Sequence, residues 1–185
     1  QGAKINAVGT PDKPIVMTSE KEEPGAWGGI HICGKAHTNA EGGKGSSEIG
    51  GAVYGGNDDA DNSGTLQYIR LEYTGFAFDE EHEANGISFY GVGNGTIVDH
   101  CEAYKGSDDG FEFFGGSVNV SNMVVVSCSD DSFDWTEGWN GKGTNLVAYQ
   151  EAESHTGLRL RLSNGVRQQR QQQRRHSRCP PRIEE

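Results

Sequence analysis

The stretch Ser107–Glu137, SDDGFEFFGGSVNVSNMVVVSCSDDSFDWTE, carries the same short pattern twice. The hexad Asp108–Phe113 (DDGFEF) returns as Asp130–Trp135 (DDSFDW), 22 residues later. A period of about 20 to 25 residues, built from short apolar alternations, is typical of a solenoid that adds one coil per repeat. We therefore expect the two hexads to lie on successive coils. The stacked acidic pairs would then be Asp108 with Asp130, Asp109 with Asp131, and Glu112 with Asp134.

Stacked carboxylates repel each other. Neighbouring strands lie about 4.8 Å apart, and two like charges at that distance cost roughly 3 to 4 kcal/mol at an effective dielectric near 20. A ladder of this kind needs a bound cation, a shared proton, or side chains that point away into water. The sequence leaves three alternatives open: a Ca²⁺ site, a catalytic pair of carboxyl groups without a metal, or a solvated acidic face.

Working outward from this stretch, the rest of the chain shows related strands. One set of similar segments lies at residues 65–73, 96–104, 118–126 and 144–149, and shorter strands lie between them at residues 87–90, 111–114 and 133–135. Glycine or asparagine stands at the corners, and no amphipathic helix of useful length is present. This arrangement predicts an all-β chain: a right-handed parallel β-helix over residues 1–154. Period-two alternation places Phe111, Phe113 and Phe133 inside it.

Charge divides the chain into two parts. Residues 1–154 hold 8 Lys and Arg against 25 Asp and Glu, a net charge of −17, whereas residues 155–185 have a net charge of +6. The strongly acidic segment 1–154 disfavours nucleic acid as a partner. It favours cations, or glycans that bind to the protein through cations. The chain contains no run of 18 apolar residues, so no transmembrane segment is predicted. No signal peptide is found, which fits either a mature secreted chain or a chain trimmed at its start.

The segment 155–185, HTGLRLRLSNGVRQQRQQQRRHSRCPPRIEE, lacks strand alternation and differs in composition from everything before it. Back-translation with suitable Arg, Gln and Leu codons, followed by a slip of one nucleotide, gives TLGYDCDCLMECDNNGNNNDATPVAHPVL. That string is acidic and rich in Asp, Asn and Gly, like the body of the protein. We therefore predict that residues from about 155 onward are translated out of frame and that the natural protein continues with further coils. The coding DNA tests this prediction.

Four segments carry a resemblance to a known group of proteins. They are PGAWGGI (residues 24–30), GTLQYIRLEY (64–73), DDGFEFFGG (108–116) and DDSFDWTEGW (130–139). Together they resemble secreted bacterial right-handed β-helix proteins of the Bacteroidetes group, many of them cell-surface or lipoprotein ectodomains. The resemblance covers roughly residues 13–153. It implies a β-helix fold and a secreted or cell-surface location rather than a particular activity.

A second, partial resemblance points to an enzyme family. Asn85-Gly-Ile-Ser, followed by SDDGFEFFGGSVNVSN from Ser107, is similar to the coils of polygalacturonase-type glycoside hydrolases. Asp108 and Asp109 match that family's Asp-Asp pair, and Asn85 stands where its first motif has an Asp. The third motif would fall near Asp131 but has no His, and no Arg-x-Lys follows. Half the signature is therefore absent, which argues against true membership.

Two chemistries suit the acidic ladder. Carboxyl groups about 5 to 5.5 Å apart serve retaining glycosidases, and repulsion between stacked Asp109 and Asp131 would raise one pKa. Alternatively Ca²⁺, which prefers carboxylate oxygens, would neutralise the ladder and polarise a bound uronate, ester or lactone. The predicted metal ligands are Asp108, Asp109, Glu112, Asp130, Asp131 and Asp134, and the predicted catalytic residues are Asp108, Asp109 and Asp131.

Aromatic side chains near the same ridge are candidates for substrate binding: Tyr90, Trp135 and Trp139. The sequence thus predicts an extracellular β-helix protein with a Ca²⁺-binding acidic ridge. Its expected activity is that of a Ca²⁺-dependent hydrolase or lyase acting on a glycan, ester or lactone. The alternative is a non-catalytic cell-surface adhesion or glycan-binding module.

Overall fold

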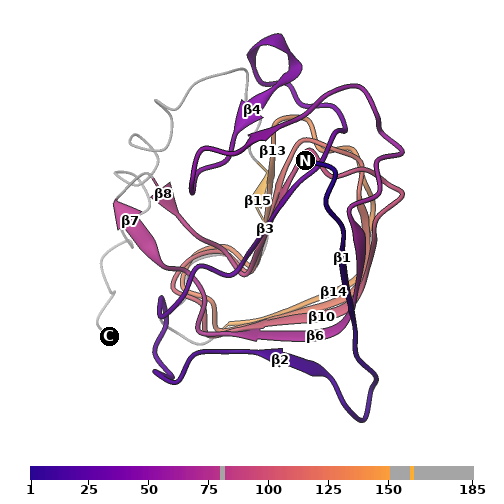
Figure 1. Ribbon diagram of the computed structural model, residues 1–185. Helices are drawn as coiled ribbons and strands as arrows, with labels where there is room; N and C mark the ends of the chain where they lie inside the picture. The colour runs from indigo at the N-terminus through magenta and orange to yellow at the C-terminus, as the bar shows by residue number, and fades with distance from the viewer. Residues whose placement is uncertain (80–81, 151–158, 161–185) are drawn as a thin grey trace, which may run out of the picture.

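The computed structural model describes residues 1–79, 82–150 and 159–160. Viewed along the axis of the coils, the chain winds repeatedly around one apolar interior, with successive strands lying over one another (Figure 1). All pairings between the coils are parallel. The predicted right-handed parallel β-helix is confirmed.

Two stacked sheets form the walls of the solenoid. The first has the order β1-β6-β10-β12-β14, and β2 also pairs with β6. Its strands are β1 (Ile5–Val8), β2 (Ile15–Met17), β6 (Gly64–Glu72), β10 (Ile97–Tyr104), β12 (Asn119–Val126) and β14 (Gly143–Tyr149). The second has the order β3-β9-β11-β13-β15. Its strands are β3 (Ile30–Cys33), β9 (Ile87–Tyr90), β11 (Phe111–Phe114), β13 (Phe133–Thr136) and β15 (Arg159–Leu160).

Each long strand of the first sheet bends at one residue in the left-handed conformation. These residues stack at equivalent positions and have φ between 51° and 54°: Tyr68, His100, Asn122 and Asn145. Asn tolerates this conformation better than most residues because its short polar side chain forms local hydrogen bonds. Here the Asn145 amide donates to Asn122 Oδ1 at 2.9 Å. The bend turns each coil, so β1 pairs with the part of β6 before Tyr68 and β2 with the part after it.

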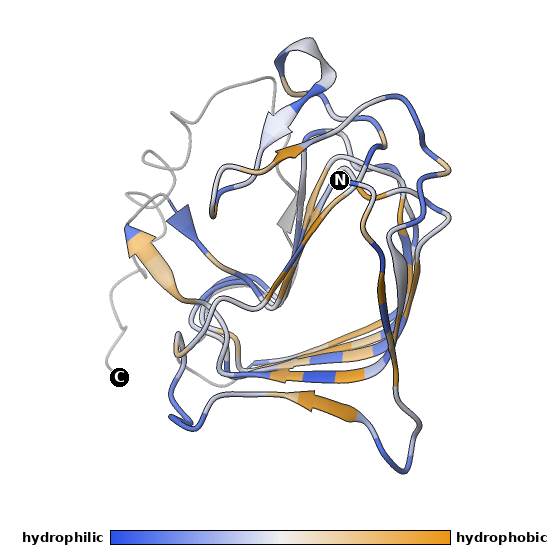
Figure 2. Ribbon diagram, in the orientation of Figure 1, coloured by the Kyte–Doolittle hydropathy of each residue, from blue (hydrophilic) through white to orange (hydrophobic). Residues whose placement is uncertain are grey.

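Stacked apolar columns fill the interior. Hydropathy alternates along the strands of the first sheet (Figure 2), and their core hydrophobic residues, such as Leu66 and Val98, are buried. One column runs through Ile32, Phe89 and Phe113, and the rings of the two Phe residues stack with centroids 5.0 Å apart. Phe111 and Phe133 are 0% and 2% exposed and also stack on each other. The predicted inward positions of Phe111, Phe113 and Phe133 are confirmed.

The register of the two hexads is the predicted one. Phe111 pairs with Phe133 and Glu112 with Asp134, so the copies lie on adjacent coils. In the first sheet the offset between β10 and β12 is also 22 residues, since Ile97 pairs with Asn119. The acidic positions of the repeat therefore lie one above the other on the outer side of the second sheet.

Two excursions leave the regular coils. The long excursion (residues 34–63) contains a 3₁₀ turn at Glu41–Gly43 and the short antiparallel pair β4 (Gly45–Ser46) and β5 (Val53–Tyr54). It folds over part of the second sheet, where Tyr54 packs against Tyr90 with ring centroids 5.1 Å apart. The second excursion is the hairpin of β7 (Ala77–Asp79) and β8 (His82–Glu83).

The part of the chain that the structure describes contains no helix long and apolar enough to cross a membrane. The prediction that residues 155–185 are translated out of frame falls almost wholly on residues outside the described ones. Within that segment, only β15 is described, and its backbone pairs in parallel with β13. The out-of-frame origin of this segment stays a prediction.

Candidate functional site

The candidate site lies on the outer side of the second sheet, where two turns enter β11 and β13. Each turn carries an Asp pair, Asp108-Asp109 in one coil and Asp130-Asp131 in the next. The turns stack closely because Gly110 has no side chain: a Cβ there would lie 2.7 Å from the Ser132 carbonyl oxygen. The Gly110 N–H donates to the Asp131 carbonyl oxygen at 2.9 Å. This contact fixes the two acidic turns against each other.

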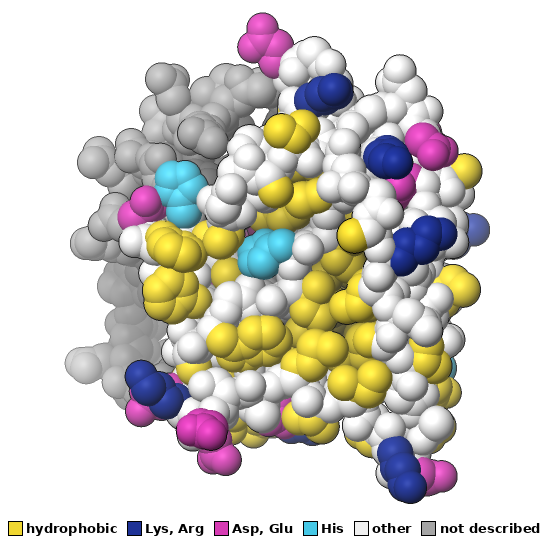
Figure 3. Space-filling view, in the orientation of Figure 1, with side chains coloured by type: hydrophobic (Ala, Val, Ile, Leu, Met, Phe, Trp, Pro, Cys, Tyr) yellow, Lys and Arg dark blue, Asp and Glu magenta, His cyan; other side chains and the backbone are white. Residues whose placement is uncertain are grey.

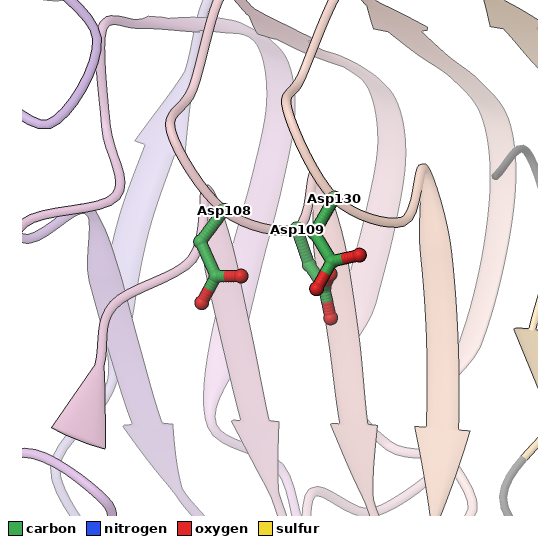
Figure 4. Close-up of side chains that lie close together, drawn as sticks. All are labelled: Asp108, Asp109 and Asp130. Atoms are coloured by element: carbon green, nitrogen blue, oxygen red, sulfur yellow. The ribbon is translucent and has the colours of Figure 1, made fainter. Parts of the chain in front are cut away.

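The structure brings five of the six predicted metal ligands together in two groups of three. In each group the carboxylate oxygens lie within 4.8 Å of one another. The outer group is Asp108, Asp109 and Asp130, and the inner group is Asp109, Glu112 and Asp134. Figure 4 shows the three side chains of the outer group, which project from the two stacked turns, with those of Asp109 and Asp130 side by side. Asp109 belongs to both groups and joins them.

Asp131 contributes differently from what was expected. The sequence predicts a stacked carboxylate pair of Asp109 and Asp131, but the Asp131 carboxylate belongs to neither group among the described residues. Its backbone N–H instead donates to Asp109 Oδ1 at 2.9 Å. Asp131 therefore orients the Asp109 carboxylate through its main chain, because the turn geometry directs its own side chain elsewhere.

Most of these carboxyl groups are shielded from water. Asp109 is 4% exposed and Glu112 2%, and both Asp131 and Asp134 are 0% exposed. The alternative of a solvated acidic face is wrong for these four residues. Only Asp108 and Asp130, which are half-buried, reach solvent. The outer group is thus the part of the site that a ligand can approach.

The crowding of negative charge changes the acidity of Asp109. Burial first, and then the charges of Glu112 and Asp108, raise the pKa of the Asp109 carboxyl well above its usual range. Two carboxylates within 4.8 Å repel by roughly 3 to 4 kcal/mol at an effective dielectric near 20. The arrangement therefore favours either a proton on Asp109 or a cation among these oxygens.

Asn85 extends the site to the preceding coil. It is fully buried, and its Nδ2 donates to Glu112 Oε2 at 2.8 Å and to Ser88 Oγ at 3.0 Å. Its Oδ1, which is bonded to the same carbon atom, has no hydrogen-bond partner among the described residues. A buried carbonyl oxygen without a partner is unusual. The sequence contained a signal for this position, since Asn85 precedes Asp109 by one repeat length.

The donor set fits Ca²⁺. This ion takes six to eight oxygen ligands, chiefly carboxylates and carbonyl oxygens, and the two acidic groups together with Asn85 Oδ1 supply oxygen donors only. Cys128, the soft ligand nearest in sequence, is part of the apolar core. The chemistry of the site therefore suits a hard divalent cation rather than a thiolate-binding metal.

None of the predicted substrate-binding aromatic residues, Tyr90, Trp135 and Trp139, is exposed as a free ring at the acidic groups. Tyr90 is fully buried between Tyr54 and Phe114. Trp135 faces the interior, on the opposite side of β13 from Asp134, and packs against the core together with Trp139. Trp139 also donates its ring N–H to the Val118 carbonyl oxygen at 3.1 Å. Trp135 and Trp139 therefore face away from the carboxylates. Tyr90 shares the outer side of the second sheet with Glu112, and burial, followed by the charges of Glu48 and Glu112, raises the pKa of its hydroxyl.

A cluster that the sequence did not predict anchors the long excursion at the end of β13 away from the acidic turns. Glu137 Oε2 accepts hydrogen bonds from Thr38 Oγ1 at 2.5 Å and from Tyr54 Oη at 2.8 Å. His37 adds a second link, because its ring nitrogens lie 2.7 Å from Asp59 Oδ1 and 3.0 Å from the Gly138 carbonyl oxygen. The partners are 22 to 101 residues apart, and no repeat relates them, so the sequence held no signal for them.

Comparison with known proteins gives one match. The profile of a family described as a pectate-lyase-like beta helix domain matches residues 1–178. No curated protein and no solved structure matches the chain.

Proposed function

We propose that this chain, which belongs to the pectate-lyase-like β-helix family, is a Ca²⁺-dependent lyase or hydrolase that acts on an acidic glycan. The family is of a glycan-acting lyase or hydrolase type. One observation carries the proposal for this chain: carboxylates from two successive coils converge within 4.8 Å and share Asp109. This dense cluster of negative charge is partly open to solvent and therefore suits a bound cation. The cation would in turn bind an anionic sugar.

The outer group is the proposed metal site. Asp108, Asp109 and Asp130 would hold Ca²⁺, because two of the three are half-buried and accessible from solvent. Bound Ca²⁺ would neutralise these carboxylates and polarise a carboxylate or carbonyl oxygen of the substrate. A uronate is therefore the favoured substrate, and ester or lactone groups are the other candidates.

Asp109 is the proposed proton carrier while the site holds no Ca²⁺, because a carboxyl group that ligates Ca²⁺ is ionised. Its raised pKa allows this carboxyl group to hold a proton under conditions in which an ordinary Asp is ionised. The Asp131 backbone N–H fixes Oδ1 of Asp109, and the Asn85 amide fixes Glu112 in the inner group. In this proposal Asp109 and Asp108 contact the substrate or the ion, whereas Asp131 acts as a positioning residue.

The proposed location is outside the cell or on its surface, where polymeric glycans are met. Ca²⁺ sites of moderate affinity are filled at the high Ca²⁺ concentrations outside cells. If the same site bound a glycan without turnover, the protein would be a glycan-binding or adhesion module. The experiment below separates the enzyme from this module.

The test is a panel of polyuronate, neutral glycoside, ester and lactone substrates, assayed with Ca²⁺ and with EDTA. We expect Ca²⁺-dependent turnover of a polyuronate, lost in the Asp109→Asn/Asp131→Asn variant and kept in Asp12→Asn, an exposed carboxylate in a distant turn. Equal turnover in the wild type and the double variant would contradict a role for these carboxylates. Ca²⁺-dependent binding without turnover would establish the non-catalytic module instead.

A further inference from the structure

We propose that Phe76 and Phe78, on the hairpin of β7 and β8, form an aromatic platform that stacks against a pyranose ring of the glycan. This inference rests on the proposed function, because it adds a binding subsite beside the acidic groups. The platform consists of these two side chains alone. It assigns the hairpin a role in substrate recognition that the solenoid itself does not require.

The hairpin is an insertion in one turn of the solenoid. The turn between β6 and β9 spans residues 73–86, whereas the equivalent turns before β11 and β13 span only residues 105–110 and 127–132. The short turns carry the Asp pairs, and the long one carries the hairpin. Since the regular coils close with six residues, the extra length is not needed to complete the coil.

Both Phe side chains are exposed, and neither belongs to a core cluster. Phe76 is 43% exposed, and Phe78, at 68%, is the most exposed large apolar side chain of the described residues. Their ring centroids lie 5.0 Å apart with the planes at 85°. Hydrophobic side chains reach the surface around the position of β7, beside a histidine (Figure 3). Burial in the fold therefore does not account for these two rings.

The size of the platform identifies its occupant. A Phe side chain has about 150 to 250 Å² of surface, so the exposed fractions amount to roughly 200 Å² for both rings. A stable protein interface needs about 800 Å² on each partner, several times more. One or two sugar rings match the available area. The apolar C–H face of a pyranose stacks on an aromatic ring, and the electron-rich ring face attracts those C–H bonds.

The base of the hairpin contacts the turn that carries Asp108. Ser107 Oγ donates to the Gly75 carbonyl oxygen at 2.7 Å, and the Ser107 N–H donates to the Thr74 carbonyl oxygen at 2.9 Å. A Cβ on Gly75 would lie 2.8 Å from the backbone nitrogen of Asp108. Phe76 is therefore joined directly to a residue packed against the outer acidic group. A glycan held at that group can extend onto the platform.

Polar side chains occupy the face of the hairpin opposite the rings. His82 Nδ1 lies 2.7 Å from Asp79 Oδ1 on the same hairpin. Asp79 shares the opposite face of β7 with Ala77, because side chains alternate along a strand. The rings and the Asp79–His82 pair therefore lie on opposite faces of the hairpin, and the stacking contact rests on the two rings alone.

The test is calorimetric titration of the full chain, with Ca²⁺ present, using a hexasaccharide of galacturonic acid and a neutral cellohexaose as probes. We expect wild type to bind the acidic hexasaccharide and Phe78→Ala to raise its Kd about tenfold, the effect of losing one stacked ring. Phe78→Trp should keep the affinity. Phe78→Leu, which is apolar but has no ring face, should lose most of it, and Val53→Ala, which removes an exposed apolar side chain from the other excursion, should have no effect.

The outcomes separate the platform from the proposed function. Wild-type affinity in Phe78→Ala and in the Phe76→Ala/Phe78→Ala double variant, or no binding of either probe by wild type, would overturn the platform. Neither result would affect Ca²⁺-dependent turnover that depends on Asp109. Loss of affinity in the Phe variants together with a Ca²⁺-independent reaction would keep the platform and overturn the metal site. Because both rings are exposed, thermal melts of these variants should match wild type.

Discussion

Asp109 is the residue on which the account depends most, because it joins both acidic groups and is almost fully buried. Its pKa is raised by burial and by the neighbouring carboxylates. Between the ordinary Asp pKa of about 3.9 and the raised value, the folded chain holds a proton that the unfolded chain releases. The free energy of unfolding contributed by this group therefore falls as pH rises through that window.

This gives a prediction for the protein without Ca²⁺. In EDTA, the stability of the wild type relative to Asp109→Asn should decrease as pH rises from about 4 toward neutrality, because only the wild type must ionise the buried group. Urea denaturation at a series of pH values measures the difference. A difference that stays constant with pH, or increases, would contradict a raised pKa at Asp109.

At the same scale, the limits of prediction from sequence are clear. The stacking of Glu112 on Asp134 followed from the 22-residue repeat and is confirmed. The direction of the Asp131 side chain did not follow, because it depends on the dihedral angles of a turn rather than on a period. The inward position of Trp135 was available from the sequence: if Asp134 points outward, period-two alternation turns Trp135 inward.

At the scale of elements, the column of left-handed residues determines where each coil bends. Asn122 donates to Asp99 Oδ1 at 2.8 Å and accepts from Asn145 at 2.9 Å. We expect Asn122→Ala to lower the free energy of unfolding by about 1 to 3 kcal/mol, since it loses both hydrogen bonds and disfavours positive φ. Asn122→Gly should lose less, because glycine adopts this conformation without strain. Equal stabilities of Ala, Gly and wild type by urea denaturation would refute the role of the bend.

The stacked aromatic column inside the coils gives a second prediction for the elements. Phe113 is 2% exposed and stacks on Phe89 and Trp139. Phe113→Ala should lower the free energy of unfolding by about 3 to 5 kcal/mol through lost burial and a cavity. Phe78→Ala, at an exposed position, should change it by less than about 0.5 kcal/mol. Similar losses in the two variants, measured by thermal or urea denaturation, would mean that the apolar column is not the core.

The strands and the inward residues could be predicted because β-strand alternation and the coil repeat are local and periodic. Which segments cover the outer side of the second sheet could not be predicted from the sequence. The long excursion has no repeat, and its contacts, such as Tyr54 with Glu137, join residues far apart in sequence. The sequence also left a solvated acidic face open, whereas Glu112 and Asp134 are buried.

At the scale of the whole molecule, the described coils leave β14 at the edge of the first sheet, with no further strand of that sheet among the described residues. Its side chains are exposed throughout, including Val147 at 53% and Tyr149 at 61%. A flat apolar edge strand promotes association between chains. We expect Val147→Lys to reduce concentration-dependent self-association, measured by analytical ultracentrifugation, without changing the thermal melt. Unchanged association in this variant would show that the edge is not the contact.

The acidic groups, the excursions and the coil repeat together describe one arrangement: a β-helix whose stacked turns gather carboxylates, with an aromatic hairpin on the preceding coil. The long excursion covers the column of Tyr90 and Phe114, while the outer group stays open to solvent. In this account the repeat brings equal charges together, and the cation makes their proximity favourable.

Calorimetric titration of Ca²⁺ into the metal-free protein near neutral pH tests this central claim most directly. The account predicts saturable binding of Ca²⁺ by the wild type, at least tenfold weaker binding by Asp130→Asn, which removes a ligand contributed by the second coil, and unchanged binding by Asp12→Asn. Absence of Ca²⁺ binding by the wild type, or equal affinity in Asp130→Asn, would contradict it.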